Sequence, residues 1–164
     1  MKRHSASIED YLEQIFLLTQ DGEKVTVTGI SQAMGVKKPS VSSAISRLVE
    51  NGLAIHEKYG EIHLTAKGLK IAKDVYKRHQ ALTRFLVEIL DIEEEIASED
   101  ACQMEHYLSS ASVERLDKFI EYVTTCPQGR PYWLEGFNYY LDHGKRSPEH
   151  LDVCITRCRD FRNS

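Results

Sequence analysis

Residues 1–64 contain an ordered series of helix and turn signals that restricts the possible folds more than any other feature of the chain. Ser7 is a helix-capping residue, and the apolar residues of the following IEDYLEQIFLLTQ recur at helical spacing. Thr28 stands where it can cap a short helix that Gly35 ends, and Pro39 suits the first position of a longer helix. LAIHEKYGEIHLT then forms two β-like runs around a tight turn. This order predicts a winged helix-turn-helix.

The third predicted helix separates apolar residues from small polar and basic ones. The inward-facing positions are Val41, Ile45, Leu48 and Val49. Small hydroxyls on the other face can approach DNA closely, and lysines at the helix N-terminus add positive potential. The predicted contacts with double-stranded DNA, including the hairpin tip, are Lys37, Lys38, Pro39, Ser40, Ser42, Ser43, Arg47, Lys58 and Tyr59. Solvated serines and a protein-binding winged helix are the alternatives.

Charge is unevenly distributed along the chain, although the net charge is only -4. Residues 35–78 contain nine Lys and Arg against four Asp and Glu, whereas residues 88–122 contain two against eleven. The basic block suits a polyanion. The acidic block suits a cation, or it is a solvated acidic face.

Residues 65–126 form a predicted helical domain. Thr65 is placed to cap AKGLKIAKDVYKRHQALTRFLVEIL, a predicted helix of about 25 residues, or roughly 37 Å. The segments ACQMEHYL and SVERLDKFIEYVTTC supply two further helices. Three helices with apolar stripes make too small a core to stand alone, which predicts that this domain forms a homodimer. A dimer also matches the common division of operators into two half-sites.

Residues 127–164 are predicted to be an extension that packs on the dimerisation domain. PQGRPYWLEGFNYYLDHGKRSP is loop-like and aromatic, and PEHLDVCITRCRDF is helical. Cys126, Cys154 and Cys158 are candidates for a further thiolate site, or are small buried hydrophobic residues. The predicted fold class is therefore mainly α, a winged helix-turn-helix followed by a helical dimerisation domain. No secretory signal or membrane-spanning apolar run is visible, so we expect a cytoplasmic protein without a membrane partner.

The stretch ACQMEHYL raises the question of a metal site. Cys102, Glu105 and His106 are spaced i, i+3 and i+4, which places them on one face of a helix. A buried thiol beside a surface carboxylate and imidazole is the alternative. The first helix adds Asp10 and Glu13, and the long helix adds a histidine. The six candidate metal ligands are thus Asp10, Glu13, His79, Cys102, Glu105 and His106.

Four stretches within residues 7–126 carry a resemblance to a known family: EDYLEQIF, KKPSVSSAISRLVENGLAIHEKYGEIHLTAKG, KRHQAL and EDACQMEHYLS. With them the chain resembles the diphtheria toxin repressor family of metal-dependent regulators, which includes iron-dependent repressors and manganese transport regulators. The resemblance implies a dimeric repressor, not an enzyme, that binds operator DNA only when loaded with divalent metal and controls metal homeostasis. Many iron-type members end in an SH3-like domain, which we expect to be absent here.

The resemblance also implies roles for the candidate ligands. A primary site would use Asp10, Cys102, Glu105 and His106. Asp10 stands where iron-type members have Met and manganese-type members have Asp. Cys102 matches the iron-type cysteine, which is Glu in the manganese type.

The remaining positions also combine the two types. Glu13 matches a ligand of the manganese-type paired site, and His79 matches a ligand of both groups. Thr83 and Ser98 stand where the iron-type ancillary site has Glu and His. A paired site built from Asp10, Glu13, His79, Cys102 and Glu105 remains compatible with this set.

The choice of metal depends on the softness of the ligands. A thiolate disfavours Mn²⁺ relative to Fe²⁺, Co²⁺, Ni²⁺ or Zn²⁺, whereas three carboxylates suit Mn²⁺. We therefore expect Fe²⁺ first and Mn²⁺ next, with Zn²⁺ or Co²⁺ able to bind in vitro. The alternative function is a winged-helix regulator that responds to an organic ligand or to thiol oxidation without metal.

Overall fold

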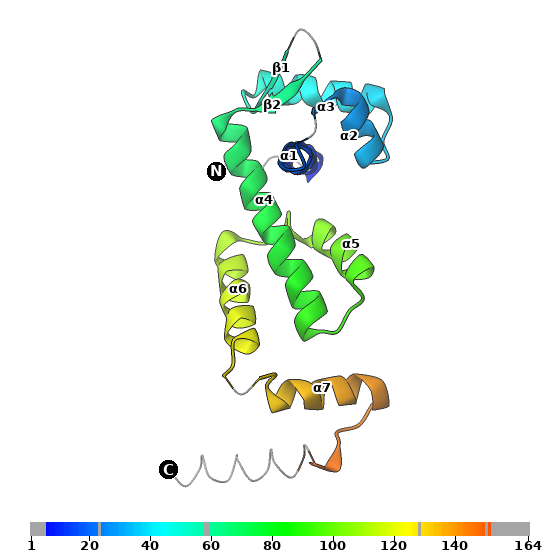
Figure 1. Ribbon diagram of the computed structural model, residues 1–164, viewed down its shortest axis with the longest axis vertical. Helices are drawn as coiled ribbons and strands as arrows, with labels where there is room; N and C mark the ends of the chain where they lie inside the picture. Colours follow the sequence, from blue (N-terminus) through cyan, green and yellow to red (C-terminus); the bar gives the residue numbers. More distant parts are fainter. Residues whose placement is uncertain (1–5, 23, 58–59, 128, 150, 152–164) are drawn as a thin grey trace. The chain divides into compact units, whose positions relative to one another are not determined.

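The computed structural model describes residues 6–22, 24–57, 60–127, 129–149 and 151, and confirms the mainly helical fold class (Figure 1). One compact unit comprises the chain up to Gln80 together with Cys102–Tyr107, and the other comprises Ala81–Ala101 together with the chain from Leu108. The elements in chain order are α1 (Ala6–Gln20), α2 (Val27–Ala33), α3 (Lys38–Glu50), β1 (Ala54–His56), β2 (Ile62–Leu64), α4 (Ala66–Arg84), the π-helical turn η1 (Phe85–Ile89), α5 (Glu94–Met104), α6 (Ser110–Thr124) and α7 (Tyr132–His143).

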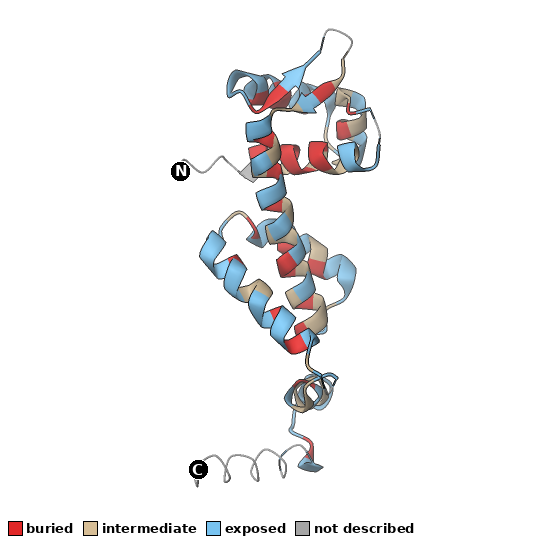
Figure 2. Ribbon diagram, turned by 60° about the vertical axis from the view of Figure 1, so that its left-hand side comes forward, coloured by how far each residue is buried: buried red, intermediate tan, exposed pale blue. Residues whose placement is uncertain are grey.

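The first unit is built around α1, which is buried on most of its circumference (Figure 2). Leu12 and Ile15 are fully buried, and α1 contacts α2, α3 and β2. The strands β1 and β2 pair antiparallel with Ile55 opposite His63.

Side-chain caps set where two helices of this unit begin. Thr26, rather than the predicted Thr28, caps α2: its backbone is extended, and its Oγ1 accepts from the Gly29 backbone N–H at 3.1 Å. Thr65 caps α4 as predicted, since its Oγ1 accepts from the Gly68 N–H at 3.1 Å. Gly68 is required there because a Cβ would collide with the Leu53 carbonyl.

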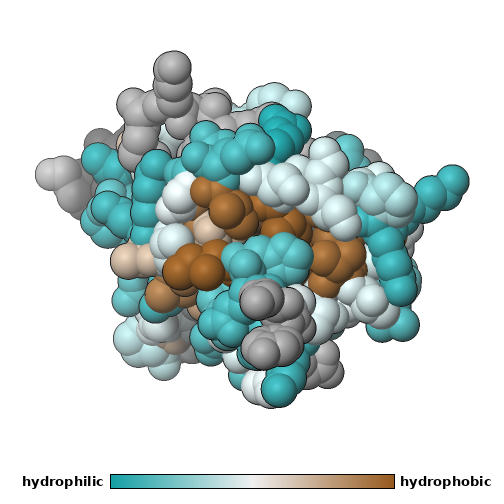
Figure 3. All heavy atoms as spheres, turned by 90° about the horizontal axis from the view of Figure 1, so that it is seen from above, coloured by the Kyte–Doolittle hydropathy of each residue, from teal (hydrophilic) through white to brown (hydrophobic). Residues whose placement is uncertain are grey.

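The helix α3 buries a narrow stripe. Its buried residues are Val41, Ala44, Ile45 and Leu48. The prediction for Val49 was wrong, because this residue lies at the edge of the stripe and is 41% exposed. Ile55 on β1 is also exposed, at 54%. The face of the molecule seen in Figure 3 has hydrophobic surface at its centre, surrounded by polar residues.

The second unit contains two small hydrophobic clusters. The helix predicted as continuous over 66–90 changes to π-helical bonding from Phe85, and Leu90 N–H donates to the Phe85 carbonyl at 3.3 Å. One cluster contains Leu82, Leu86, Ala97 and Ala101. The other contains Ile89, Ile120, Val123 and Leu134. η1 and the residues around it therefore link α5, α6 and α7 into one unit.

The prediction of a loop over the aromatic segment was wrong, because α7 occupies Tyr132–His143. The Pro and Gly residues that suggested a loop instead mark the helix ends: Pro131 is the N-cap, and Gly144 is the C-cap with φ +65°. Leu134 is buried, whereas Trp133 and Tyr140 remain exposed. Within the described residues, no helix combines the length and the apolar character needed to span a membrane.

Candidate metal centre and DNA-binding face

Three carboxylates project from α1 within the first unit. Glu9 is 8% exposed and Glu13 is 9% exposed, while Asp10 is half-buried. Helical geometry brings positions 9, 10 and 13 to neighbouring parts of one side of α1. Burying carboxylates is costly unless they are paired or bind a cation, so their surroundings are informative.

The segment that follows α5 brings a fourth carboxylate to this side of α1. α5 ends at Met104, so Glu105 and His106 lie in a turn instead of on the predicted helix. The turn is closed by a hydrogen bond from Tyr107 N–H to the Met104 carbonyl at 3.0 Å. Glu105 is 0% exposed, and its Oε2 lies 3.0 Å from His79 Nδ1 on α4. Ending the helix here thus leaves the carboxylate buried beside α4.

Two groups of potential ligands meet at Glu105. One contains Asp10, Cys102 and Glu105, and the other contains Glu13, His79 and Glu105. Within each group, one ligand atom from every residue lies within 4.8 Å of the others. Five of the six predicted ligands therefore converge, with Glu105 common to both groups.

The sixth predicted ligand, His106, lies beside the first group. Its Nε2 is 2.6 Å from Asp10 Oδ1 and 3.5 Å from Glu105 Oε1. Its Nδ1 is 2.8 Å from Glu9 Oε2, and the same oxygen accepts from Arg78 at 3.1 Å. Sequence analysis missed Glu9 and Arg78. The available signal was their position directly before Asp10 and directly before His79.

Burial of the carboxyl groups and of the Cys102 thiol, together with repulsion between their negative charges, favours the protonated forms of these groups. Burial, followed by the charge of Glu105, raises the pKa of Glu13 to about 7. Burial is also the main reason that the pKa of Asp10 is raised. Partial burial together with the charges of Glu105, Asp10 and Glu13 raises the pKa of the Cys102 thiol to about 11. A cation would oppose each of these effects.

The two imidazoles respond to the same carboxylates. The hydrogen bond to Glu105 is the main reason that the pKa of His79 is raised. Burial by itself would lower the pKa of His106, but its hydrogen bond to Glu9 and the charges of Asp10 and Glu105 outweigh burial and raise it. The carboxylates therefore favour the protonated form of both imidazoles.

The arrangement fits a divalent transition metal. Asp10 Oδ1 and Glu105 Oε1 are buried, and the polar group that faces both is Nε2 of the proposed ligand His106, at 2.6 and 3.5 Å. When Nε2 itself binds a metal, both oxygens have lone pairs available. Carboxylate, imidazole and thiolate donors together suit first-row metals from Mn²⁺ to Zn²⁺. The residues present thus satisfy the chemical requirements of a metal centre.

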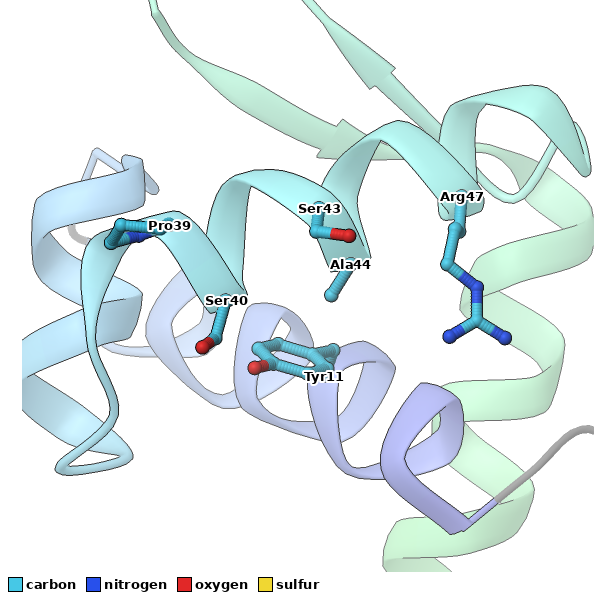
Figure 4. A pocket seen from close by; sticks show the side chains of 6 residues that line it. All are labelled: Tyr11, Pro39, Ser40, Ser43, Ala44 and Arg47. Atoms are coloured by element: carbon cyan, nitrogen blue, oxygen red, sulfur yellow. The ribbon is translucent and has the colours of Figure 1, made fainter.

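The predicted DNA-binding residues lie on a different face of the same unit. All those on α3 and its N-terminal flank are exposed: Lys37, Lys38, Pro39, Ser40, Ser42, Ser43 and Arg47. An open depression of about 500 Å³ lies along α3, lined by Pro39, Ser40, Ser43, Ala44 and Arg47, with Tyr11 of α1 (Figure 4). Tyr11, which sequence analysis did not single out, directly follows Asp10 in the chain.

Some predicted residues lie outside those that the structure describes: Lys58, Tyr59, Cys154 and Cys158. Cys126 is a free, half-buried thiol. The thiolate site proposed for the three cysteines therefore stays a prediction.

Comparison with known protein families matches two consecutive stretches of the chain. The description "Iron dependent repressor, N-terminal DNA binding domain" matches residues 4–62, and "Iron dependent repressor, metal binding and dimerisation domain" matches residues 65–134. The chain belongs to the diphtheria toxin repressor family. Members of this family of metal-dependent regulators are transcriptional regulators and not enzymes. The predicted family and the prediction that the protein is not an enzyme are therefore confirmed.

Individual members of the diphtheria toxin repressor family are similar over most of their length. A helix-turn-helix transcriptional regulator of Methanocaldococcus jannaschii is 38% identical over 118 residues, which are 71% of this chain and 94% of that protein. The regulator MntR of Bacillus subtilis is 36% identical over 116 residues, 71% of this chain and 81% of MntR. The solved structure of the manganese regulator SloR is 34% identical with a TM-score of 0.65. That alignment covers 77% of this chain and 58% of SloR.

Proposed function

We propose that this member of the diphtheria toxin repressor family is a transcriptional repressor that binds double-stranded operator DNA as a homodimer when loaded with divalent metal. The genes it controls would serve metal-ion homeostasis. One observation carries the proposal: α1, α4 and the C-terminal end of α5 with the turn after it bring two groups of ligands together at the buried Glu105. Neutralising this centre would remove the repulsion that α1 experiences there.

The proposed metal ligands divide into two groups. Asp10, Cys102 and Glu105 would hold one ion, with His106 at its edge, while Glu13 and His79 would share Glu105 around a second. When bound, a divalent cation supplies positive charge that compensates the carboxylates and favours the thiolate of Cys102. Asp10 and Glu13 would then hold α1 against α4 and the turn at Glu105.

The sequence of α1 connects this centre to the DNA-binding face. Successive helical residues point about 100° apart, so Asp10 faces the ligands while Tyr11 lines the depression on α3. The packing of α1 is further set by Phe16, whose ring lies 5.6 Å from that of Tyr76 on α4. We propose that holding α1 stabilises the orientation in which α3 binds DNA, so that metal and DNA favour the same state.

We propose Fe²⁺ as the physiological metal and Mn²⁺ as the next candidate. The argument for Fe²⁺ is the thiol of Cys102, because thiolate ligation favours Fe²⁺ over the harder Mn²⁺. Glu13, Asp10 and Glu105 are hard ligands that keep Mn²⁺ competitive. The manganese regulator SloR as a structural neighbour supports Mn²⁺ as a candidate.

The homodimer is supported by exposed apolar side chains on the second unit. Tyr122 is 79% exposed, and Phe119 and Trp133, whose ring centroids are 6.5 Å apart, are also exposed. Large exposed apolar residues are typical of surfaces that bind another chain. The match to a dimerisation domain over this region supports a second copy of this chain as the partner.

The function is tested by capturing DNA from fragments of the source genome under anaerobic conditions. The protein is incubated with a chelator, with Fe²⁺ or with Mn²⁺, and bound fragments are recovered and sequenced. We expect specific fragments to be retained with metal, most strongly with Fe²⁺, and lost with the chelator. Equal retention with the chelator would contradict metal dependence and favour a regulator that senses an organic ligand or thiol oxidation.

A further inference from the structure

We infer that Glu9 and Arg78 form a positioning pair that presents Nε2 of His106 to the metal centre, while Glu9 itself stays outside the ligand set. The inference rests on the proposed function, because it assumes that His106 is a metal ligand. Neither Glu9 nor Arg78 belongs to the two ligand groups around Glu105.

The geometry of the pair is specific. One oxygen, Glu9 Oε2, lies 2.8 Å from His106 Nδ1 and 3.1 Å from a terminal nitrogen of Arg78. All three side chains are at most 16% exposed. Water therefore has little access to this bond, and a single carboxylate oxygen holds both cationic partners.

This contact leaves Nε2 as the imidazole nitrogen that faces the metal centre, at 2.6 and 3.5 Å from Asp10 and Glu105. A carboxylate can only accept, and each ring nitrogen faces one: Nδ1 faces Glu9, and Nε2 faces Asp10. When Nε2 binds a metal, the ring proton of neutral His106 lies on Nδ1, where Glu9 can accept it. Metal-binding histidines commonly donate their other ring N–H to a carboxylate in this way.

Arg78 explains why Glu9 would remain a positioning residue and not become a ligand. Its guanidinium occupies the oxygen that also contacts His106, and Arg78 directly precedes the proposed ligand His79 on α4. The pair thereby connects α1, α4 and the turn after α5. These segments, together with the end of α5 that carries Cys102, supply the proposed ligands.

The first test measures the ring proton of His106 in protein loaded with Zn²⁺, which is diamagnetic and binds neutral imidazole. ¹⁵N chemical shifts distinguish a proton on Nδ1 from a proton on Nε2. We expect Nδ1–H in the wild type and in Glu9→Gln, because one amide oxygen can accept from both His106 and Arg78. We expect Glu9→Ala to lose this preference. Wild-type protein with its proton on Nε2 would contradict the inference.

The second test titrates Co²⁺ anaerobically and follows its visible absorption. Glu9→Ala should bind about 10- to 100-fold more weakly than the wild type, while Glu9→Gln stays close to it. Asp21→Asn, on an exposed residue just beyond α1, serves as the matched control. Glu105→Ala should bind no Co²⁺ at this site.

The outcomes separate this inference from the proposed function. Failure of the wild type to bind Co²⁺ would contradict the metal centre itself. Normal binding by both Glu9 variants would refute only the positioning role, and equal loss in Glu9→Gln and Glu9→Ala would make Glu9 a ligand. If Glu9→Ala does not fold, Arg78→Met tests the same contact, and an unchanged ring proton with unchanged affinity would overturn the inference.

Discussion

The candidate metal centre and the predicted DNA-binding face belong to the same unit but are built in opposite ways. The predicted DNA-binding residues that the structure describes lie within eleven consecutive positions, from Lys37 to Arg47, and are exposed. The proposed ligands come from three segments spread from Asp10 to His106, and they surround the fully buried Glu105. The contrast teaches that the exposed residues of α3 need no bound ligand to be stable in the folded protein. The candidate metal centre instead buries carboxylates whose negative charges repel one another, and a bound cation would compensate that repulsion.

Substitutions at the predicted DNA-binding face and at the candidate metal centre should therefore have different effects. Exposed cations on α3 lose little hydration on folding, so changes there should affect DNA binding and leave stability alone. Changes at the metal centre should alter stability, metal affinity and DNA binding together. The following predictions test this distinction, from the largest expected effect to the smallest.

Glu105→Gln should have the largest effect, because Glu105 is the residue that both ligand groups share. We expect metal affinity to fall by roughly 1,000-fold, about 4 kcal/mol, and metal-dependent DNA retention to disappear. Isothermal titration and DNA capture measure the two losses. Glu99→Gln, an exposed carboxylate on α5, is the control and should behave as the wild type. A variant that still binds DNA in a metal-dependent way would exclude the shared-ligand arrangement.

The free energy of unfolding of metal-free protein should fall as pH rises. Glu13 has its pKa raised from 4.5 to about 7, so its contribution is fully present below pH 4.5 and is lost as pH rises through 7. The corresponding decrease is at most about 3 kcal/mol, and the raised pKa values of His79 and His106 act in the same direction.

Urea unfolding between pH 5 and 8 with a chelator measures this dependence. Glu13→Gln should reduce it, and Glu99→Gln should leave it unchanged. Metal affinity should show the opposite trend and rise with pH, because ligation requires deprotonated side chains. A metal-free protein whose stability increases from pH 5 to 8 would contradict the electrostatic description of the centre.

Arg47→Ala should weaken DNA binding without changing metal affinity. Removing one phosphate contact should lower DNA affinity by about tenfold and reduce the slope of log K against log salt by about 1. Fluorescence anisotropy with a captured fragment at several salt concentrations tests this. Lys73→Ala removes one exposed cation from α4 and is the matched control. Reduced metal affinity in Arg47→Ala would contradict the expectation that substitutions on α3 leave the metal centre unchanged.

Cys102→Glu should have the smallest effect, because it exchanges one anionic ligand for another. We expect the preference for Fe²⁺ over Mn²⁺ to shift toward Mn²⁺ by about tenfold, while metal-dependent DNA binding persists. Competition titrations with Fe²⁺ and Mn²⁺ measure the ratio. If the ratio does not change, Cys102 lies outside the metal-selecting ligands.

The sequence alone determined which residues of α3 are buried and which form its exposed, predicted DNA-binding face, except for Val49. Its residues are close in the chain, and helical periodicity separates Ser40, Ser43 and Arg47 from the buried Val41 and Leu48. The segments carrying the candidate ligands were also recognisable, through spacing and family resemblance. Helical periodicity is sufficient to separate the buried from the exposed residues of α3 because both sets lie on one helix.

Only the tertiary structure decided how the metal centre is assembled. The sharing of Glu105, the end of α5 before Glu105 and the contacts of Glu9 with Arg78 and His106 depend on α1, α4 and the turn after α5 meeting in space. The helix α7 is a similar case, because its Pro and Gly ends resemble a loop until Leu134 is seen to pack. Periodicity describes one segment at a time, whereas burial and charge coupling arise between segments distant in the chain.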